Sequence, residues 1–364
     1  MGLVVWMGGW TARLVRWLMC GEIGYNEGIN RMVFNRLGGV GNMRNGYRLC
    51  VLLSVMWLSG CVVNQFKLPK DATDPLEEFT LSGSGEEKIL MISVTGVISG
   101  KEVKEMLSTT PSIVQQVVSR LKKAEKDPRI KMVLFKVDSP GGGVLASDVL
   151  YHEILEFKHR TDIPVGVIMM GLAASGGYYI SLPSDWIMAH PVTLTGSVGV
   201  VFSRPKVKSL MTKVGVDMAI KKSGRNKDMA SPFRSETEEE SRLMQQMVDQ
   251  FAGRFVGLVQ KHRQLTPEAL KTVKTARIFH AEEALKLGLI DGIGYLDDAL
   301  DKSRETAELS QDVSVIVYRR NQYAEDNMYN DADTQTKPLL SVGWLSSVLG
   351  ATSGFYYLWP AILP

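Results

Sequence analysis

Cysteine, charge of a single sign and long apolar runs are all scarce in this chain. Its 364 residues include three cysteines, which is too few for a small scaffold held together by disulfides. The 42 basic and 39 acidic residues give a net charge of +3 without a long run of either sign, so no nucleic-acid partner is expected. With 45% hydrophobic residues, the chain has the composition of an ordinary globular protein that is stabilised by its core.

Lysine is absent from residues 1–66, although the rest of the chain is rich in it. Arg44 and Arg48 precede an apolar run at residues 49–58, which is too short to cross about 30 Å of hydrocarbon. Small residues follow the run, as they do before a signal-peptidase site. We therefore predict a signal peptide at residues 43–60.

Residues 1–42 show neither a sustained helical stripe nor the alternation of a strand. We interpret them as an upstream extension of the reading frame, with synthesis starting at Met43. A genuine cytoplasmic or membrane-surface extension is the alternative.

The segment Leu-Ser-Gly-Cys at residues 58–61 resembles the lipobox of bacterial lipoproteins. In that family the cysteine receives a diacylglycerol, so Cys61 would anchor the protein to a membrane. A plain secretory signal with an incidental cysteine is the alternative. Because Cys20 and Cys50 precede the cleavage site, the mature chain would have no disulfide.

Strand-like and helix-like segments alternate in the main part of the chain. After a polar tether at residues 61–87, we predict strands at 89–97, 130–137 and 164–169 and helices at 112–126 and 146–158. This βαβα order predicts an α/β fold, with a mostly parallel sheet and flanking helices.

A long helix is predicted further along, because Thr237 and Glu240 have the spacing of a capping box. One face of this helix is apolar and predicts a core contact or a subunit interface rather than a cofactor site; its residues are Met244, Met247, Val248, Phe251, Phe255, Leu258 and Val259. A shorter helix at 281–287 with Gly288 at its end and a late strand at 313–318 follow.

The C-terminal part is divided into residues 306–338, which contain the late strand and an acidic linker, and an apolar tail at 339–364. Glycine and proline interrupt the tail too often for a transmembrane helix. Because residues 355–364 are apolar and resemble an extended substrate, one hypothesis is that they fold back into an active-site groove and inhibit the protein.

Glycine-rich segments follow two of the predicted strands, at residues 138–143 and 171–179. Sites in open α/β sheets lie at such carboxyl ends of strands. Ser175 stands at a strand-to-helix transition and is followed by two glycines, which let a substrate backbone approach. It is therefore the candidate nucleophile.

No motif surrounds any of the five histidines, so a Ser-His-Asp triad is not evident; they are His152, His159, His190, His262 and His280. The other possible base is a lysine, whose pKa must fall well below its usual value of about 10.4. Residues 221–234 supply candidate lysines, although these residues by themselves favour a solvated basic loop.

Five segments occur in the order found in the SppA signal peptide peptidases, and on them the chain resembles that family in its short form with one catalytic domain. They are Asp-Ser-Pro-Gly-Gly-Gly at 138–143, Ala-Ala-Ser-Gly-Gly-Tyr-Tyr at 173–179, Thr-Gly-Ser-Val-Gly at 195–199, the stretch from Lys227 to Arg234, and residues 279–294. The resemblance extends over a peptidase domain at residues 88–305.

The resemblance implies a role for each matched position. Ser175 would be the nucleophile, Lys227 its general base, and Ser197 the serine that orients the lysine. The backbone amides of Gly142 and Gly176 would form an oxyanion hole. No metal or other cofactor is implied.

The family also implies a crotonase-like and ClpP-like fold and a ring-shaped homo-oligomer, such as an octamer, in which serine and lysine come from neighbouring subunits. The substrates would be signal peptides or other apolar peptides. The protein would be anchored in the cell envelope through Cys61, with the catalytic domain outside the cytoplasm, on the periplasmic side in a Gram-negative host. The inner and the outer membrane are both compatible destinations, because Val62 follows the cysteine.

Two positions depart from the family pattern: Ala276 stands where glycine is common, and His280 where a small polar residue is usual. Two other functions stay open at this point. One is a crotonase-type acyl-coenzyme A enzyme, and the other is a non-catalytic envelope scaffold. Tyr178 and Tyr179 could line substrate pockets or serve only in helix packing.

Overall fold

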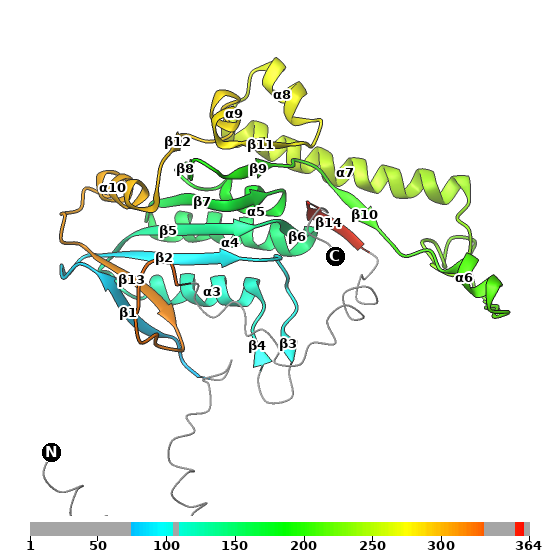
Figure 1. The fold of residues 1–364 in the computed structure, drawn as a ribbon, viewed down its shortest axis with the longest axis horizontal. Helices are drawn as coiled ribbons and strands as arrows, with labels where there is room; N and C mark the ends of the chain where they lie inside the picture. The colour runs from blue at the N-terminus through cyan, green and yellow to red at the C-terminus, as the bar shows by residue number, and fades with distance from the viewer. Residues whose placement is uncertain (1–73, 105–108, 331–353, 360–364) are drawn as a thin grey trace, which may run out of the picture. The chain divides into compact units, whose positions relative to one another are not determined.

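A computed structural model describes residues 74–104, 109–330 and 354–359 of the chain (Figure 1). The predicted signal peptide, the candidate lipid anchor Cys61 and most of the apolar tail lie outside the described residues. Among the residues that are described, no helix is both long and apolar enough to cross a lipid bilayer.

The main sheet has the strand order β1-β13-β2-β5-β7-β8-β12, and it is parallel from β13 to β12. β9 pairs in parallel with β7, while β1 and β11 are antiparallel to β13 and β9. The mainly parallel α/β sheet expected from the sequence is confirmed. The strands are β1 (Glu77–Ser82), β2 (Lys88–Thr95), β5 (Ile130–Ser139), β7 (Val165–Ala174), β8 (Trp186–Ala189), β9 (Leu194–Gly196), β11 (Ile278–His280), β12 (Gly292–Ile293) and β13 (Ser314–Arg319).

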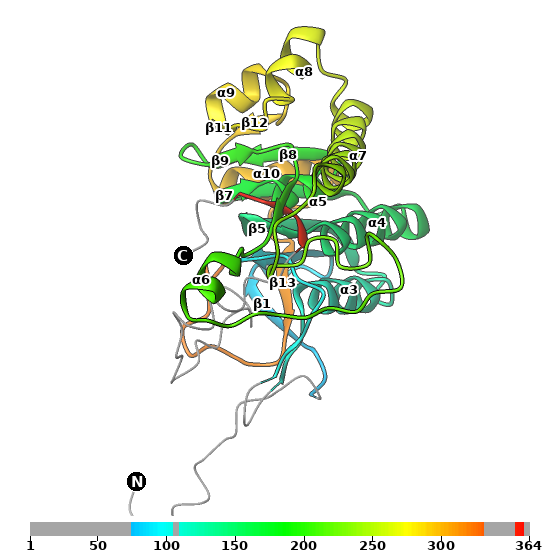
Figure 2. The ribbon, with the colours of Figure 1, turned by 90° about the vertical axis from the view of Figure 1, so that its right-hand side faces the viewer.

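Helices cover both faces of this sheet, which explains why β2 and β5 are apolar along most of their length. One face packs against α3 (Ile113–Ala124), α4 (Val144–Thr161), α5 (Gly176–Ser181), α7 (Glu238–Arg263), α8 (Pro267–Val273) and α9 (Ala281–Lys286). The other packs against α10 (Leu296–Thr306). Figure 2 shows α3 and α4 beside each other on one side of the strands.

The helix ends follow the sequence signals. Ser112 and Gln115 form a capping box at the start of α3, and Thr237 and Glu240 form the predicted one at the start of α7. Acidic residues fill the first turn of α7 and basic residues its last turn, which complements the helix dipole.

Two elements differ from the expected boundaries, and the first of them positions the site. β7 continues to Ala174 rather than ending near residue 169, so Ser175 follows the strand directly. Glu77–Ser82, within the segment expected to act as a tether, pair with β13 as β1 because Phe79 and Leu81 alternate toward the apolar cluster beneath α10.

A second, three-stranded sheet has the order β10-β14-β6 and consists of β6 (Gly141–Gly143), β10 (Val201–Ser203) and β14 (Gly354–Leu358). β14 belongs to the apolar tail and is antiparallel to both neighbours. A hairpin of β3 (Val103–Lys104) and β4 (Thr109–Thr110) and a short α6 (Lys208–Lys213) complete the described elements.

Candidate active site

Ser175 occupies the junction between β7 and α5, at the carboxyl edge of the parallel sheet. Its backbone has φ 52° and ψ −112°, a conformation that costs a non-glycine residue about 1–3 kcal/mol and persists only where its surroundings impose it. Those surroundings include the Gly196 carbonyl, which accepts the Ser175 N–H at 2.7 Å, and the Tyr179 N–H, which donates to the Ser175 carbonyl at 2.8 Å. Strained serines in sharp strand-to-helix turns are typical of nucleophiles.

The amides of Gly142 and Gly176 lie close to each other beside this turn. A Cβ atom on Gly176 would stand 3.0 Å from the Gly142 nitrogen and 2.6 Å from Ser147 Oγ. The close approach therefore requires glycine at this position. The structure brings together three of the predicted site residues: Ser175, Gly142 and Gly176.

Hydrogen bonds hold the loop that carries Gly142. Ser139 Oγ accepts the Gly141 N–H at 3.1 Å and donates to the Gly96 carbonyl at 2.7 Å. Asp138 Oδ1 accepts the Leu172 N–H at 2.9 Å, which ties the two glycine-rich segments to each other. These bonds explain why Asp138 and Ser139 accompany the glycines.

Ser197 is buried and follows β9, the neighbour of β7. It has φ 51°, and its N–H donates to the Arg277 carbonyl at 2.9 Å. Since Gly196 accepts the Ser175 N–H, Ser197 is one residue away from a direct backbone contact with the candidate nucleophile.

Lys227 is exposed and lies in the segment between α6 and α7. Figure 1 shows α6 and this segment apart from β7 and α5. Among the described residues, none forms a hydrogen bond or ion pair with the Lys227 side chain. A single chain therefore does not bring Lys227 to Ser175.

None of the five histidines forms a hydrogen bond with Ser175 in the described structure. His262 lies in α7, where its Nε2 is 2.8 Å from the Tyr151 hydroxyl. Burial, together with the nearby cations Lys261 and Lys158, lowers the pKa of His262 below its usual value. It is a packing residue of the α4–α7 contact.

The described part of the chain contains no group of three or more His, Cys, Asp or Glu side chains that could hold a metal ion.

β14 lies against the glycine loop and beside α5. Figure 1 shows it, in dark red, next to β6 and near β10. The Tyr357 side chain is fully buried and its ring stacks on Tyr179, with 4.9 Å between centroids. Burial raises the pKa of Tyr357 to about 12, so its hydroxyl keeps its proton at neutral pH.

The two tyrosines that could line a pocket have different roles. Tyr178 is packed within the core and its hydroxyl donates to the Leu289 carbonyl at 2.8 Å. Tyr179 contacts the tail strand, and its hydroxyl donates to Asp148 Oδ1 at 2.6 Å. Asp148 in turn pairs with Arg254 at 2.7 Å, which fixes the orientation of the Tyr179 ring.

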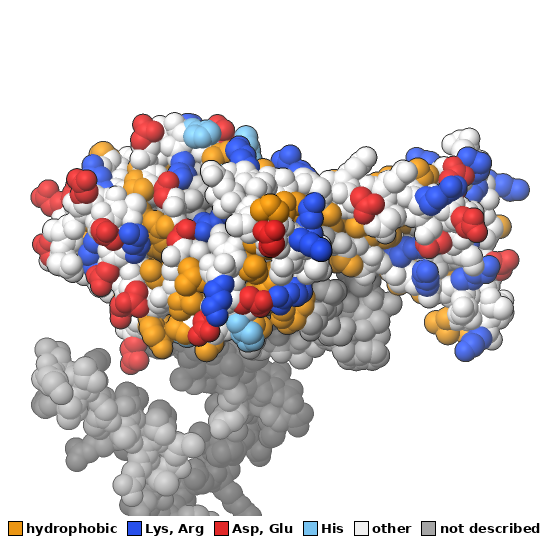
Figure 3. All heavy atoms as spheres, turned by 90° about the horizontal axis from the view of Figure 1, so that it is seen from above, with side chains coloured by type: hydrophobic (Ala, Val, Ile, Leu, Met, Phe, Trp, Pro, Cys, Tyr) orange, Lys and Arg blue, Asp and Glu red, His pale blue; other side chains and the backbone are white. Residues whose placement is uncertain are grey.

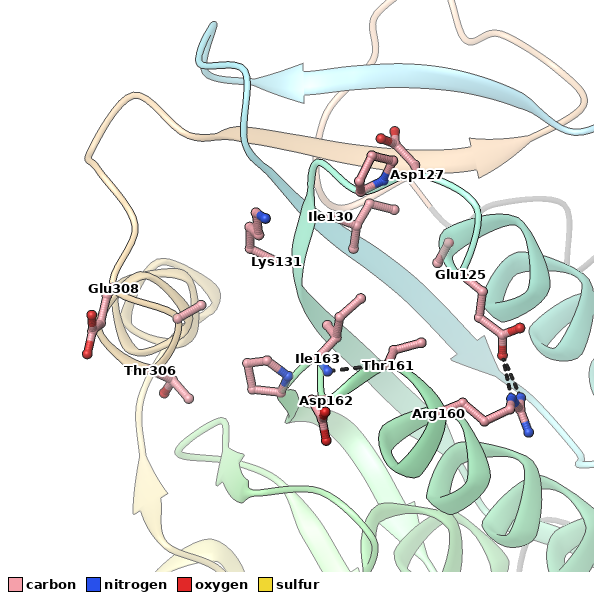
Figure 4. A pocket seen from close by; sticks show the side chains of 14 residues that line it. Glu125, Asp127, Ile130, Lys131, Arg160, Thr161, Asp162, Ile163, Thr306 and Glu308 are labelled. Carbon is pink, nitrogen blue, oxygen red and sulfur yellow. Dashed lines mark hydrogen bonds and ion pairs between the residues drawn. The ribbon is translucent and has the colours of Figure 1, made fainter.

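A separate surface pocket of about 560 Å³ lies at the opposite edge of the sheet (Figure 4). It is lined by residues that precede β5 and β7, such as Pro128 and Pro164, and by the Glu125–Arg160 ion pair. Because sites of parallel sheets lie at the carboxyl edge, where Ser175 is, this pocket is not the candidate active site.

The surface seen in Figure 3 has acidic and basic side chains interspersed. Five exposed apolar side chains lie in α6 and in the segment that follows it, and no residue of α6 is buried. They are Leu210, Val214, Val216, Met218 and Ile220, each at least 41% exposed.

Sequence reasoning missed the residues around Tyr357. Phe251 and Phe255 were recognised only as part of the apolar face of α7, and Asp148 and Arg254 were not singled out. The available signal was the pair Phe355 and Tyr357, whose spacing of two is that of a strand with one buried face.

Comparison with known proteins identifies the family. Residues 158–310 match the model of peptidase family S49. The chain is 39% identical over 243 residues to a protein of Enterococcus faecium named signal peptide peptidase SppA, which covers 67% of this chain and 70% of that protein. It is 33% identical over 229 residues to a protein of Synechocystis sp. named as a protease, covering 63% of this chain and 78% of the relative.

Protease 4 of Salmonella typhi is a longer relative, 35% identical over 193 residues that make up 53% of this chain and 31% of that protein. Together with the buried serine turn and its glycine amides, these similarities lead to one conclusion. The chain belongs to peptidase family S49, a family of serine-type proteases.

Proposed function

We propose that this chain is a membrane-anchored serine endopeptidase that cleaves extended apolar peptides, such as remnant signal peptides, with a Ser175–Lys227 catalytic pair. One observation carries the proposal: a strained, buried serine lies beside the closely spaced amides of Gly142 and Gly176. Family membership supports the protease activity itself.

In the proposed reaction, Ser175 Oγ attacks the carbonyl carbon of the substrate while Lys227 Nζ takes the hydroxyl proton. The negative charge on the substrate oxygen is stabilised by the N–H groups of Gly142 and Gly176, each contributing about 3 kcal/mol. Lys227 then returns the proton to the leaving amine, and a water molecule hydrolyses the acyl-enzyme. Ser197 would orient the lysine.

Lys227 would reach Ser175 from a neighbouring subunit of a ring-shaped homo-oligomer with a crotonase-like and ClpP-like fold. Two observations support this arrangement: Lys227 is exposed, and five apolar side chains nearby in sequence are each at least 41% exposed. Apolar patches of this kind are typical of interfaces. Burial against a neighbour would also lower the pKa of the lysine, as a general base requires.

We also propose that the protein is localised to the cell envelope. Cys61 would carry the lipid, and residues 88–305 would act outside the cytoplasm.

Complementation between inactive variants tests this function. Ser175→Ala and Lys227→Ala should each abolish hydrolysis of a fluorogenic apolar peptide, while a reassembled mixture of the two regains part of it. Lys221→Ala, in the same exposed segment, is the matched control and should keep full activity. Activity retained in either single variant would reject the catalytic pair.

A non-catalytic scaffold of the same fold is the second candidate, and the separation of Lys227 from Ser175 in a single chain favours it. An assembled wild-type oligomer that hydrolyses no peptide, but still forms the ring, would establish the scaffold.

A further inference from the structure

Ser147, near the start of α4, has a buried hydroxyl without a partner. The residue is completely buried, and among the described residues none forms a hydrogen bond with its Oγ atom. A buried hydroxyl that lacks a partner destabilises the folded state, because it has lost its hydrogen bonds to water. Native proteins keep few such groups, so this one calls for a physical reason.

The other buried serines in the described helices form a hydrogen bond within their own helix. Ser181 and Ser303 each donate to the carbonyl four residues earlier, at 2.8 Å and 2.7 Å. Serine in a helix commonly satisfies its hydroxyl in this way. For Ser147 the corresponding carbonyl belongs to Gly143, the N-cap of α4, and the hydroxyl does not bond to it. The Ser147 hydroxyl is therefore not held by its own helix.

The Ser147 Oγ atom lies against Gly176. The point that a Cβ on Gly176 would occupy is 2.6 Å from Ser147 Oγ and 3.0 Å from the Gly142 nitrogen. The Gly176 nitrogen is bonded to the same Cα as that Cβ would be. The Ser147 hydroxyl and the two proposed oxyanion donors are thus grouped around one point beside Ser175.

The start of α4 favours negative charge in this place. The helix is 18 residues long and begins directly after the glycine loop, at its N-cap Gly143. No side chain in the described structure caps it there, and its first turn contains no acidic residue. The positive end of the helix dipole is therefore not compensated. The O–H group of Ser147, which has no competing acceptor, is free to turn toward a negative charge that develops beside it.

We propose that Ser147 is a further catalytic residue, whose hydroxyl donates a third hydrogen bond to the negatively charged substrate oxygen beside the amides of Gly142 and Gly176. The charge develops when Ser175 Oγ bonds to the carbonyl carbon and the π electron pair moves onto the oxygen. The hydrogen bond is lost when the carbonyl forms again and the amine leaves. An interaction made only in the transition state raises kcat and leaves substrate binding unchanged. The proposal rests on the proposed peptidase function.

Ser147→Ala in the full-length oligomer tests the third donor. With a fluorogenic apolar peptide, kcat should fall by about 10- to 100-fold and KM should stay the same, because two of the three donors remain. The midpoint of urea unfolding should rise, since alanine removes the unpartnered hydroxyl and leaves no other group unpaired. A higher midpoint with unchanged kcat would show that the hydroxyl has no catalytic role, and would overturn the proposal.

Ser303→Ala is the matched control. It removes the hydroxyl of another buried helical serine, in α10 on the other face of the sheet, where the hydroxyl has a partner. This change should leave kcat unchanged and lower the midpoint of urea unfolding. The opposite signs of the two changes in stability separate a hydroxyl without a partner from one that is bonded.

A peptide aldehyde measures the interaction with the tetrahedral state directly, because Ser175 Oγ adds to its carbonyl carbon. Ser147→Ala should weaken aldehyde binding by the same factor as kcat. The peptide alcohol of the same sequence cannot form this adduct, so its Kd should not change. An equal loss of affinity for aldehyde and alcohol would mean that Ser147 acts on substrate binding, and would reject the third donor.

The wild-type protein separates this proposal from the proposed function. If it hydrolyses no peptide and binds the aldehyde no more tightly than the alcohol, the peptidase function and the third donor are both rejected. If wild type and Ser147→Ala hydrolyse the peptide with the same kcat, only the third donor is rejected.

Discussion

Ser175 and Ser197 leave neighbouring parallel strands at the same level. Ala174 of β7 pairs with Gly196 of β9, so the next residue of each strand is one of the two serines. Both have positive φ values, 52° and 51°. The pairing therefore brings two motifs that stand apart in sequence to the same edge of the sheet.

Replacement of Ser197 tests its positioning role. Ser197→Ala should lower kcat by about 10- to 100-fold without changing KM, because the base loses the hydroxyl that orients it. Ser197→Gly should lose the same activity, yet raise the free energy of unfolding by about 1 kcal/mol, since glycine tolerates φ 51°. Steady-state kinetics and urea unfolding measure both effects.

Ser235→Ala, an exposed change, serves as the control and should alter neither quantity. Equal activity of wild type and Ser197→Gly would show that Ser197 does not position the base.

Arg234 predicts a specific dependence of stability on pH. Its guanidinium bonds the carboxylates of Asp228, at 2.8 Å, and Glu240, which holds the segment next to Lys227 on the start of α7. The hydrogen bonds from Arg234 lower the pKa of Glu240 from 4.5 to about 2 and hold that of Asp228 well below its usual range.

Because the folded pKa values are the lower ones, this stabilisation is complete above about pH 4.5 and is lost as the pH falls toward 2. Arg234→Met should therefore be less stable than wild type at pH 7, and the difference should shrink between pH 4.5 and 2. Urea unfolding at a series of pH values measures it. If the difference in unfolding free energy between wild type and Arg234→Met stayed constant from pH 4.5 to 2, protonation of Asp228 and Glu240 would not weaken these ion pairs, and the prediction would be wrong.

Ala276 and Gly199 predict a coupled pair of substitutions. Ala276 has φ 58°, which disfavours any side chain, and a Cβ atom on Gly199 would stand 2.7 Å from the Ala276 Cβ. Ala276→Gly should stabilise the protein by about 0.5–1 kcal/mol. Gly199→Ala should destabilise it by about 1–3 kcal/mol through overpacking.

In the double variant most of the cost of Gly199→Ala should disappear, because the atom it meets has been removed. Thermal unfolding of the four proteins gives the coupling energy. Simple additivity of the two changes would contradict the predicted contact.

Local sequence signals were sufficient for most of the fold. Capping boxes at Ser112 and Thr237 and the apolar runs of β2 and β5 depend on neighbouring residues, and the structure has these elements close to their expected bounds. The two glycines after Ser175 were likewise sufficient to predict the strand-to-helix turn that carries this serine. The family resemblance, rather than periodicity, supplied Lys227 and Ser197.

The remaining features depend on contacts between distant residues. β14 pairs with a loop more than 200 residues earlier, and no local pattern encodes such a partner. Likewise, the orientation of Tyr179 depends on Asp148 and Arg254, which come from two other helices. The surroundings of Tyr179 could therefore be recognised only once these elements were in place.

The position of β13 has a consequence for the order in which the chain can fold. β13 lies between β1 and β2, so neither strand gains its neighbour on that side until residue 319 has been made. β6 and β10 likewise wait for residues 354–358. Contacts that close such long loops are slow to form. In a chain synthesised from its amino end, the β1–β13–β2 edge of the main sheet and the whole of the three-stranded sheet would thus be completed last.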